Sequence, residues 1–368
     1  MKNKLFAAAV LNRMARRPIR GLRNCLLAAG ALLVAQVPSQ VQAQTYDFYY
    51  LGSMGSNRPF IYNTPTLNNM GQAAGTSSVS GVLRATVWSG AVPSYPTVPA
   101  GSLSGAVGIN DSGVVAGAIG SQAAQWSGGA YTLLSGLGGV AAWSSAINNA
   151  GQIAGDAYLP SGVMHATLWT AGVPTDLGAL PGTNNSFANA INNSGVVAGV
   201  SDGSALGGPT TAVTWTGGAG PVILPRPGYN VTQAFAINDS GVVGGSGMVS
   251  PTGGFRALLW NGGSAPVALP GLGATWSDNV YGLNNAGDAV GLSAAVSGYS
   301  SAVLWPAGTG TLVDLNNAVV NVSLSSLGYV LTEADDINDL GWITGRLRNL
   351  NTGLVDLFLL IPAPAGRP

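Results

Sequence analysis

The chain has 368 residues, with 14 Lys and Arg against 14 Asp and Glu, one His and one Cys. All 14 acidic residues but only half of the basic ones lie beyond residue 43, so the rest of the chain is acidic, which argues against nucleic acid or an anionic membrane as its partner. A single His, and no Lys or Cys beyond residue 43, exclude a histidine-cluster zinc site, a Schiff base and a thiol nucleophile there. We expect no cofactor.

Residues 1–43 have the three parts of a secretory signal. Basic residues come first, an apolar run follows over 25–37, and Val41, Gln42 and Ala43 form a small-residue cleavage site. The apolar run is too short to span a bilayer. The expected organisation is a signal peptide over 1–43, a repeat domain over 44–362 and a tail over 363–368. We expect a protein that is exported to the periplasm, cell surface or medium, with no stable membrane insertion.

One phrase recurs seven times after the signal. It consists of an apolar residue, Asn, one or two turn residues, Gly, a short apolar pair and Gly, as in INNSGVVAG from Ile191. Self-similarity at a near-constant period is typical of a repeat architecture, in which each unit buries its apolar face against its neighbours. The anchor asparagines of this phrase are Asn68, Asn110, Asn148, Asn192, Asn238, Asn284 and Asn338.

A tryptophan follows six of the anchors, 16 to 23 residues later, and Leu360 takes its place in the last unit. We expect these indoles to be buried between units with their N–H groups bonded; exposed platforms for stacking on sugars are the alternative. The six residues are Trp88, Trp126, Trp169, Trp215, Trp260 and Trp305.

Each repeat predicts four short strands. In the unit that starts near Pro174, the expected strands cover about 174–180, 186–192, 195–200 and 211–216, with a tight turn at Asn193, Ser194 and Gly195. Four strands in about 45 residues are typical of a β-propeller blade. A β-solenoid is the main competitor, but its coils are shorter and less variable.

The two ends of the chain predict how the ring closes. The last unit has only three expected strands, at about 329–338, 342–347 and 354–361, whereas residues 46–52 form a strand that precedes the first anchor. This strand would complete the last blade and leave no unpaired edge. The predicted fold is all-β, a seven-bladed β-propeller of four-stranded blades closed by the N-terminal strand. Small residues stand two places before six anchors, and Asp336 is the exception.

The anchor phrase, the tryptophan strand and the Asp-Leu-Gly strand together resemble the extracellular HAF-repeat family of exported bacterial proteins. The resemblance covers most of the chain from Tyr46 to Pro362, although the His-Ala-Phe triplet is never complete: the nearest match is His165, Ala166 and Thr167 before Leu168 and Trp169. It implies export and a propeller-like repeat, and it carries over no catalytic residues.

Three catalytic or metal sites deserve consideration. A Ser-His-Asp triad would have to use His165. A paired-carboxylate mechanism would use an acidic cluster peculiar to the last unit, for which a solvated, irregular strand next to the ring closure is the simpler explanation. Calcium could bind at the three Asn-Asp turns, but turn chemistry explains these turns fully. The acidic cluster is Glu333, Asp335, Asp336 and Asp339.

A polar residue, whose type varies among the units, stands four places before each tryptophan position. Equivalent positions in a propeller would form a ring of variable polar groups, and two of these are arginines, which suits an anionic ligand. Any polar residue suffices at a solvent-facing strand position, so the ring has a structural explanation too. The seven candidate binding residues are Arg84, Gln122, His165, Thr211, Arg256, Ser301 and Asp356.

The sequence alone favours a secreted, monomeric, non-enzymatic binding or scaffold module at the cell surface or in the extracellular matrix. Its partner would be a polysaccharide or another surface component. The alternative is a carbohydrate-active enzyme, a lyase or glycosidase, that uses the acidic cluster between Glu333 and Asp339. Fold alone cannot choose between these functions, because propellers host both.

Overall fold

The computed structural model describes residues 44–53, 65–202, 210–250, 253–273, 277–294 and 299–364. The predicted signal peptide lies outside these residues, as do the last four residues of the tail. No helix in the described part of the chain is long and apolar enough to cross a membrane.

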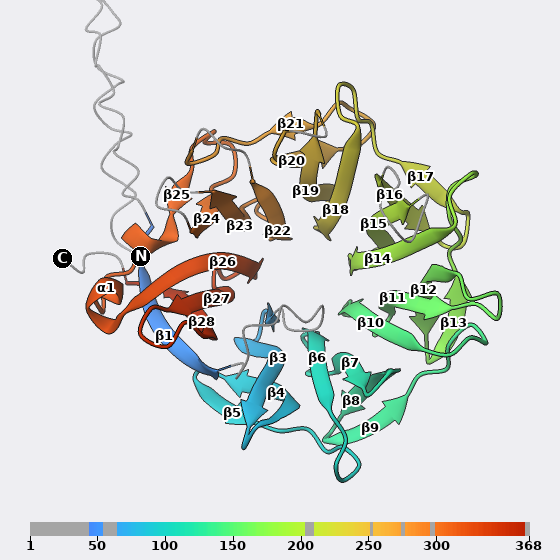
Figure 1. Cartoon of the computed structure of the whole chain (residues 1–368), viewed down its shortest axis with the longest axis horizontal. Helices are drawn as coiled ribbons and strands as arrows, with labels where there is room; N and C mark the ends of the chain where they lie inside the picture. The colour runs from blue at the N-terminus through green and yellow to red at the C-terminus, as the bar shows by residue number, and fades with distance from the viewer. Residues whose placement is uncertain are drawn as a thin grey trace, which may run out of the picture. The chain divides into compact units, whose positions relative to one another are not determined.

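The domain is a ring of seven antiparallel sheets, each of four strands (Figure 1). In six sheets the four strands are consecutive in the chain, and the seventh combines the N-terminal strand with the last three strands. The strand with which the chain enters each sheet from the preceding one lies nearest the centre of the ring. This arrangement confirms the predicted seven-bladed β-propeller.

Blades are numbered in chain order, and strands within each are given from the centre outward. Blade 1 is β2 (Thr66–Leu67), β3 (Gln72–Val79), β4 (Val82–Ser89) and β5 (Val92–Ser94). Blade 2 is β6 (Ser104–Ile109), β7 (Val115–Ile119), β8 (Gln122–Ser127) and β9 (Ala130–Leu133). Blade 3 is β10 (Ala142–Ile147), β11 (Ile153–Tyr158), β12 (Met164–Thr170) and β13 (Val173–Asp176). Blade 4 is β14 (Asn185–Ile191), β15 (Val196–Asp202), β16 (Thr211–Thr216) and β17 (Pro221–Ile223).

The remaining blades follow the same order. Blade 5 is β18 (Val231–Ile237), β19 (Val242–Met248), β20 (Arg256–Asn261) and β21 (Val267–Ala268). Blade 6 is β22 (Asn279–Leu283), β23 (Ala289–Ala294), β24 (Ser300–Trp305) and β25 (Val313–Asp314). Blade 7 is β26 (Tyr329–Ile337), β27 (Ile343–Asn349), β28 (Val355–Pro362) and β1 (Tyr46–Ser53).

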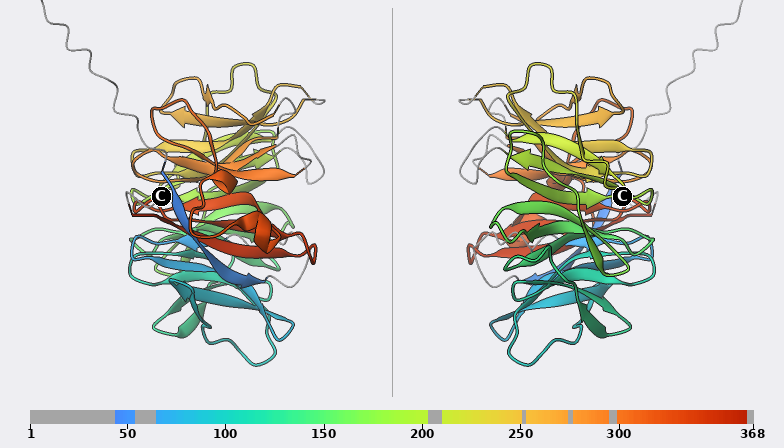
Figure 2. Two further views of the ribbon diagram at one scale, coloured as in Figure 1. Left: turned by 90° about the vertical axis from the view of Figure 1, so that its left-hand side faces the viewer. Right: turned by 90° about the vertical axis from the view of Figure 1, so that its right-hand side faces the viewer.

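Blade 7 joins the two ends of the chain. Strand β1 pairs antiparallel with β28, from Tyr46 opposite Pro362 to Ser53 opposite Asp356, as the strand count predicted (Figure 2). The long connection from blade 6 holds η1 (Leu315–Asn317) and α1 (Leu324–Leu327), and it fixes β1 from the other side. There the Asn321 side chain accepts from the Phe48 N–H and donates to the Phe48 carbonyl, at 2.8 and 3.1 Å.

The sequence repeat and the blade are offset by one strand. The segment that was expected at 174–180 as the first strand of its unit supplies β13, the outer strand of the preceding blade.

The core lies between the blades, in seven clusters of buried apolar side chains. The cluster between blades 3 and 4, for example, packs Leu168 and Ala154 against Trp215 and Val197. All six repeat tryptophans are buried, and each indole N–H donates to a backbone carbonyl, as expected. Small residues before the anchors allow this close approach: a side chain at Gly282 would lie 2.8 Å from the backbone of Asp336 on blade 7.

Each anchor asparagine builds the turn between the first two strands of its blade and binds the next blade. In blade 4 the Asn192 side-chain oxygen accepts from the backbone N–H groups of Ser194 and Val196, at 3.1 and 2.9 Å. Gly195 follows with a positive φ of 78°, which a residue with a side chain rarely adopts. The Asn192 amide nitrogen donates to the carbonyl of Asn238 on blade 5. An ionised Asp could accept the two turn bonds but could not donate the bond to the next blade, because a carboxylate has no donor.

Candidate functional site in the central channel

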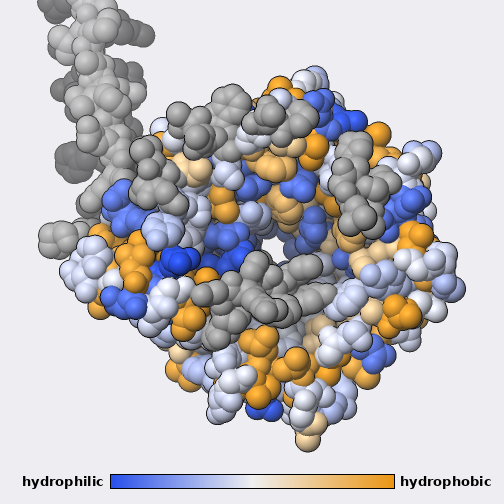
Figure 3. All heavy atoms as spheres, in the orientation of Figure 1, coloured by the Kyte–Doolittle hydropathy of each residue, from blue (hydrophilic) through white to orange (hydrophobic). Residues whose placement is uncertain are grey.

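The inner strands of six blades carry a β-bulge at the same place, three residues before the anchor. The pairing register shifts there and leaves one residue unpaired, which bends the strand and redirects that side chain. All six unpaired residues line a cavity of about 860 Å³, and Figure 3 shows the opening at the centre of the ring. We call these residues the bulge ring: Val107, Ser145, Asn189, Phe235, Tyr281 and Asp335.

Aromatic side chains cover the cavity wall on four consecutive blades, from blade 3 to blade 6. Trp143 on β10 and Phe187 on β14 stand five residues before their anchors, and Phe235 and Tyr281 belong to the bulge ring. Tyr158 on β11 packs edge-on against Trp143, with ring centroids 5.9 Å apart. The centroids of Phe235 and Tyr281 are 5.3 Å apart. These five residues, all half-buried, are called the aromatic arc below.

Blade 7, next to the end of this arc, presents a charged cluster. Bulges on both sides of Glu333 and Ala334 bring Glu333 and Asp335 to Arg346, which lies opposite Glu333 on β27. The guanidinium binds Asp335 through two nitrogens, with Nε 3.1 Å from Oδ2 and Nη2 2.7 Å from Oδ1. The same Nη2 lies 2.6 Å from Oε1 of Glu333. The Asp335 side chain is 1% exposed, whereas Glu333 is 16% exposed and contacts the cavity. We call Glu333, Asp335 and Arg346 the carboxylate cluster.

The carboxylate cluster holds more acidic groups than its one cation can neutralise. Burial, and then the neighbouring Asp335, raise the pKa of Glu333 to about 8 against the opposing effect of Arg346. Burial also raises the pKa of Asp335, again against Arg346. Because the guanidinium is forked onto Asp335, that carboxyl is the better stabilised anion of the two. Glu333, which lines the cavity, is therefore the carboxyl group of the pair that takes up a proton more readily.

Two further carboxyl groups line the cavity and are satisfied by backbone donors. Asp156 on β11 accepts from the Ala188 N–H of blade 4 at 2.8 Å, and burial raises its pKa to about 8. Asp336 accepts from Leu67 N–H of blade 1 at 2.8 Å, and burial raises its pKa to about 7. Asp336, the exception among the small residues before the anchors, thus ties blade 7 to blade 1.

The acidic cluster predicted from the sequence is divided by the structure. Glu333 and Asp335 share Arg346, Asp336 bonds to blade 1, and Asp339 lies in a hydrogen-bonded ring at one end of the channel. The simpler explanation of a solvated, irregular strand is wrong in one respect. The strand is irregular, because it carries two bulges, but Asp335 is buried and Glu333 is mostly so.

Two closed rings of hydrogen bonds surround that end of the channel. In the first, each anchor asparagine donates its side-chain N–H to the carbonyl of the next anchor, and Asn338 returns to Asn68 at 2.8 Å. In the second, the backbone N–H of each following residue donates to the side chain of its counterpart in the next blade. We call the first the anchor ring and the second the turn ring.

The turn ring accounts for the three Asn-Asp turns. Asp111, Asp239 and Asp339 are never neighbours in the ring, and Asn side chains beside them donate to their free oxygens, as Asn285 does to Asp239 at 3.0 Å. Burial alone would raise the pKa of Asp239, but hydrogen bonds from Asn193 and Asn285 lower it. No group of three or more His, Cys, Asp or Glu in the described residues could hold a metal ion. The carboxylates of Asp111, Asp239 and Asp339 accept hydrogen bonds from the turn of the neighbouring blade.

The seven candidate binding residues occupy equivalent positions near the start of the third strand of each blade, which is β28 in blade 7. None of them lines the central cavity. Thr211, Ser301 and Asp356 are buried, whereas Gln122 is exposed, so the seven do not share one solvent-facing band. A binding role for these residues stays a prediction.

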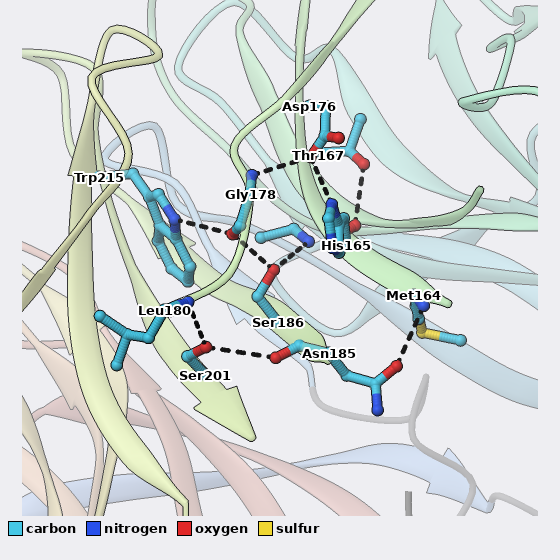
Figure 4. A network of polar contacts seen from close by, with 11 residues as sticks. Met164, His165, Thr167, Asp176, Gly178, Leu180, Asn185, Ser186, Ser201 and Trp215 are labelled. Carbon is cyan, nitrogen blue, oxygen red and sulfur yellow. Dashed lines mark hydrogen bonds and ion pairs between the residues drawn. The ribbon is translucent and has the colours of Figure 1, made fainter. Parts of the chain in front are cut away.

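His165 pairs with Asp176 on the outer strand of its blade, and their Nδ1 and Oδ1 atoms are 2.8 Å apart (Figure 4). The nearby Ser186 hydroxyl donates to the Gly178 carbonyl at 2.8 Å and accepts from the Ala166 N–H at 2.9 Å. A serine nucleophile would have to bond to the imidazole instead. Within the described residues, His165 therefore forms no catalytic triad.

Neither the aromatic arc nor Arg346 was predicted from the sequence. In the sequence, these residues stand at fixed distances from the anchor, at positions where the residue type varies from blade to blade. Five places before it stand Gly105, Trp143, Phe187, Gln233, Asn279 and Glu333, in order from blade 2 to blade 7. Eight places after it, Asp156 and Arg346 are equivalent. Of the residues at these two variable positions, those that line the cavity are Trp143, Phe187, Glu333, Asp156 and Arg346.

No family model matches the chain, and no curated protein matches it. Among solved structures, a puromycin-hydrolyzing peptidase of Mycobacterium tuberculosis is 12% identical with a TM-score of 0.48, covering 83% of this chain and 54% of its own. The β-propeller domain of the Trilobed protease from Pyrococcus furiosus is 12% identical with a TM-score of 0.44, covering 88% and 86%. Porphyromonas gingivalis dipeptidyl peptidase 4 is 9% identical with a TM-score of 0.42, covering 77% and 50%. The chain thus spans about half the length of the two full peptidases.

These comparisons correct the expectation of a non-enzymatic binding or scaffold module. The similar structures include peptidases, and a propeller fold by itself does not exclude an enzyme. At 9 to 12% identity the likeness shows the fold and transfers no activity to this chain. What this chain can do must be argued from its own channel.

Proposed function

We propose that the protein is a carbohydrate-active enzyme, a glycosidase, whose site is the central cavity and whose proton donor is Glu333. The observation that carries this proposal is the carboxyl group of Glu333, which lines a cavity of about 860 Å³ and shares Arg346 with the buried Asp335. Glycosidases need such an acid, with a pKa raised by its environment, to protonate the leaving oxygen.

The residues present support one sequence of proton movements. Glu333 gives its proton to the glycosidic oxygen as the bond between that oxygen and the anomeric carbon breaks. A water molecule then adds to the anomeric carbon and returns a proton to the Glu333 carboxylate. Arg346 and Asp335 act as positioning residues, since Arg346 holds Oε1 of Glu333 and Asp335 holds Arg346.

Hydrolysis fits the cavity better than elimination, the other reaction class suggested by the sequence. A lyase needs a base that removes a proton from carbon. Burial raises the pKa of the Tyr281 phenol well above its usual range, so this neighbour of the cluster is held in its protonated form.

Turnover of neutral and acidic polysaccharides by the purified protein tests the proposal. We expect reducing ends to appear on at least one substrate, and Glu333→Gln to lower kcat by about 10²-fold to 10⁴-fold, the usual contribution of a general acid. Activity of the wild type should fall as the pH rises through about 8, because Glu333 then loses its proton.

Asp176→Asn is the matched control, because Asp176 lies on the outer strand β13 and pairs with His165. Its turnover should equal that of the wild type. Full activity in a folded Glu333→Gln protein, or no activity on any glycan, would refute the proposal.

Export and membership of the HAF-repeat family belong to this proposal. The three-part pattern of residues 1–43 supports export, and the sevenfold anchor phrase supports the family. A glycan-cleaving enzyme outside the cytoplasm would meet polymeric carbohydrate directly. Detection of the mature protein, starting at Gln44, in the periplasm or medium tests this part.

A further inference from the structure

We propose that the aromatic arc is a binding subsite for uncharged sugar residues, which leads from Trp143 on blade 3 to Glu333 on blade 7. The inference deepens the proposed function and rests on it for the reaction only. Binding by the arc is a separate claim with a separate measurement.

The arc is not required by the fold. The six repeat tryptophans are fully buried between blades, whereas Trp143 is half-buried and lines the cavity. At the positions equivalent to Trp143 and Phe187, the other blades use Gly105, Gln233, Asn279 and Glu333. Aromatic side chains on consecutive blades therefore serve the cavity. Apolar surface that is exposed in a cavity is removed from water when a ligand covers it, and this favours binding of the ligand.

The shape of the wall suits rings with an apolar face. Trp143 is held edge-on by Tyr158, and Phe235 is tilted against Tyr281, so each pair is fixed by its partner and both pairs line the cavity. The C–H face of a pyranose ring can lie on such aromatic surface while its hydroxyl groups remain free to form hydrogen bonds. A cavity of this size, about 860 Å³, is in the range of small-molecule sites and holds more than one sugar residue.

The charges of the wall exclude an anionic sugar. Among the described residues that line the cavity, Arg346 is the one basic residue. Its guanidinium already pairs with Glu333 and Asp335. Asp156 and Asp336 add two further carboxyl groups. A uronate or sulfated sugar would find no available cation and would be repelled by any ionised carboxylate. The substrate class is therefore a neutral glycan.

The test uses the full mature domain with Glu333→Gln, so that turnover does not consume the ligand, and with neutral hexasaccharides of glucose, mannose, galactose and xylose units. Binding is followed by tryptophan fluorescence and calorimetry, with hexagalacturonate as the anionic probe. We expect at least one neutral oligosaccharide to bind more tightly than hexagalacturonate. Trp143→Ala should weaken that binding at least tenfold, whereas Tyr131→Ala, which removes an exposed ring on the outer strand β9, should not change it.

The outcomes separate the two proposals. If a neutral oligosaccharide binds through Trp143 but the wild type cleaves no glycan, the subsite stands and the glycosidase function fails. If the wild type cleaves only acidic polysaccharides, the reaction stands and this inference is overturned. Failure of all neutral probes to bind, or binding that Trp143→Ala leaves unchanged in a folded protein, also overturns it.

Discussion

The bulge ring lies on the inner strands and the anchor ring three residues further along, in the turns that follow these strands, yet the two rings follow opposite rules. The anchor ring has the same residue in all seven blades, and every side-chain amide in it is bonded within the protein. The bulge ring has a different residue in each of six blades, and all of them contact the cavity. The repeat therefore fixes the fold at the anchor position and leaves the residues of the channel wall free to vary three residues earlier.

Blade 7 carries both an anchor and the carboxylate cluster. Removing Arg346, the cation of that cluster, should have the largest effect on stability. Arg346→Met leaves the buried Asp335 and Glu333 without their shared partner. Breaking a buried ion pair on one side typically destabilises a protein by about 3 to 5 kcal/mol. Urea unfolding at pH 7 measures this loss. Arg348→Met, two residues further along β27, is the control, since Arg348 lies over the ring of Tyr299 rather than in the cluster, and it should cost less than about 1 kcal/mol.

An anchor should come next in size. Asn192→Ala removes two acceptor bonds to its own turn and one donor bond to blade 5. At about 1 kcal/mol for each hydrogen bond, we expect a loss of about 2 to 3 kcal/mol in the free energy of unfolding. Asn192→Asp keeps the acceptors and loses the donor, so its melting temperature should lie between the wild type and the alanine variant. An alanine variant as stable as the wild type would contradict the role of the anchor ring.

A smaller and pH-dependent effect is expected from Asp156, which faces the cavity from the second strand of blade 3. Its pKa is about 8 in the folded protein and near 3.8 when unfolded, so the folded state binds more protons between these values. Stability conferred by this group is therefore greatest at low pH and is lost as the pH rises toward 8. Asp156→Asn should flatten that decline and be more stable than the wild type at pH 9, where the wild type carries a buried charge at this position. Unfolding curves at pH 5, 7 and 9 decide this, and equal slopes for both proteins would exclude it.

Much of the fold was predictable because its determinants are local and repeated. The anchor phrase encodes a turn in nine consecutive residues, and the surplus strand at residues 46–52 encodes the closure with β28. The offset between sequence repeat and blade follows from that same strand. None of these required knowledge of contacts between distant residues.

The site was harder to predict because it depends on contacts across strands and blades. Glu333 and Asp335 were found as an acidic cluster, but their partner Arg346 comes from the next strand, and bulges on β26 decide which side chains meet. Trp143 and Tyr281 are 138 residues apart in sequence and share a wall only because blades 3 and 6 face one centre. Alternation of side chains along a strand does not predict the bulge that turns them inward.

The smallest effect is expected at a bulge-ring position without charge or aromatic area. Ser145 on β10 stands three residues before the anchor Asn148 and faces the cavity with a small side chain. Ser145→Ala should change the free energy of unfolding by less than about 0.5 kcal/mol, as is usual for sites away from packing and caps. Asn148→Ala, on the same strand end, should lose several times more, because Asn148 bonds both to its own turn and to Asn192 of the next blade. If Ser145→Ala costs as much as Asn148→Ala, the channel wall is part of the framework, and its variation among blades has no functional meaning.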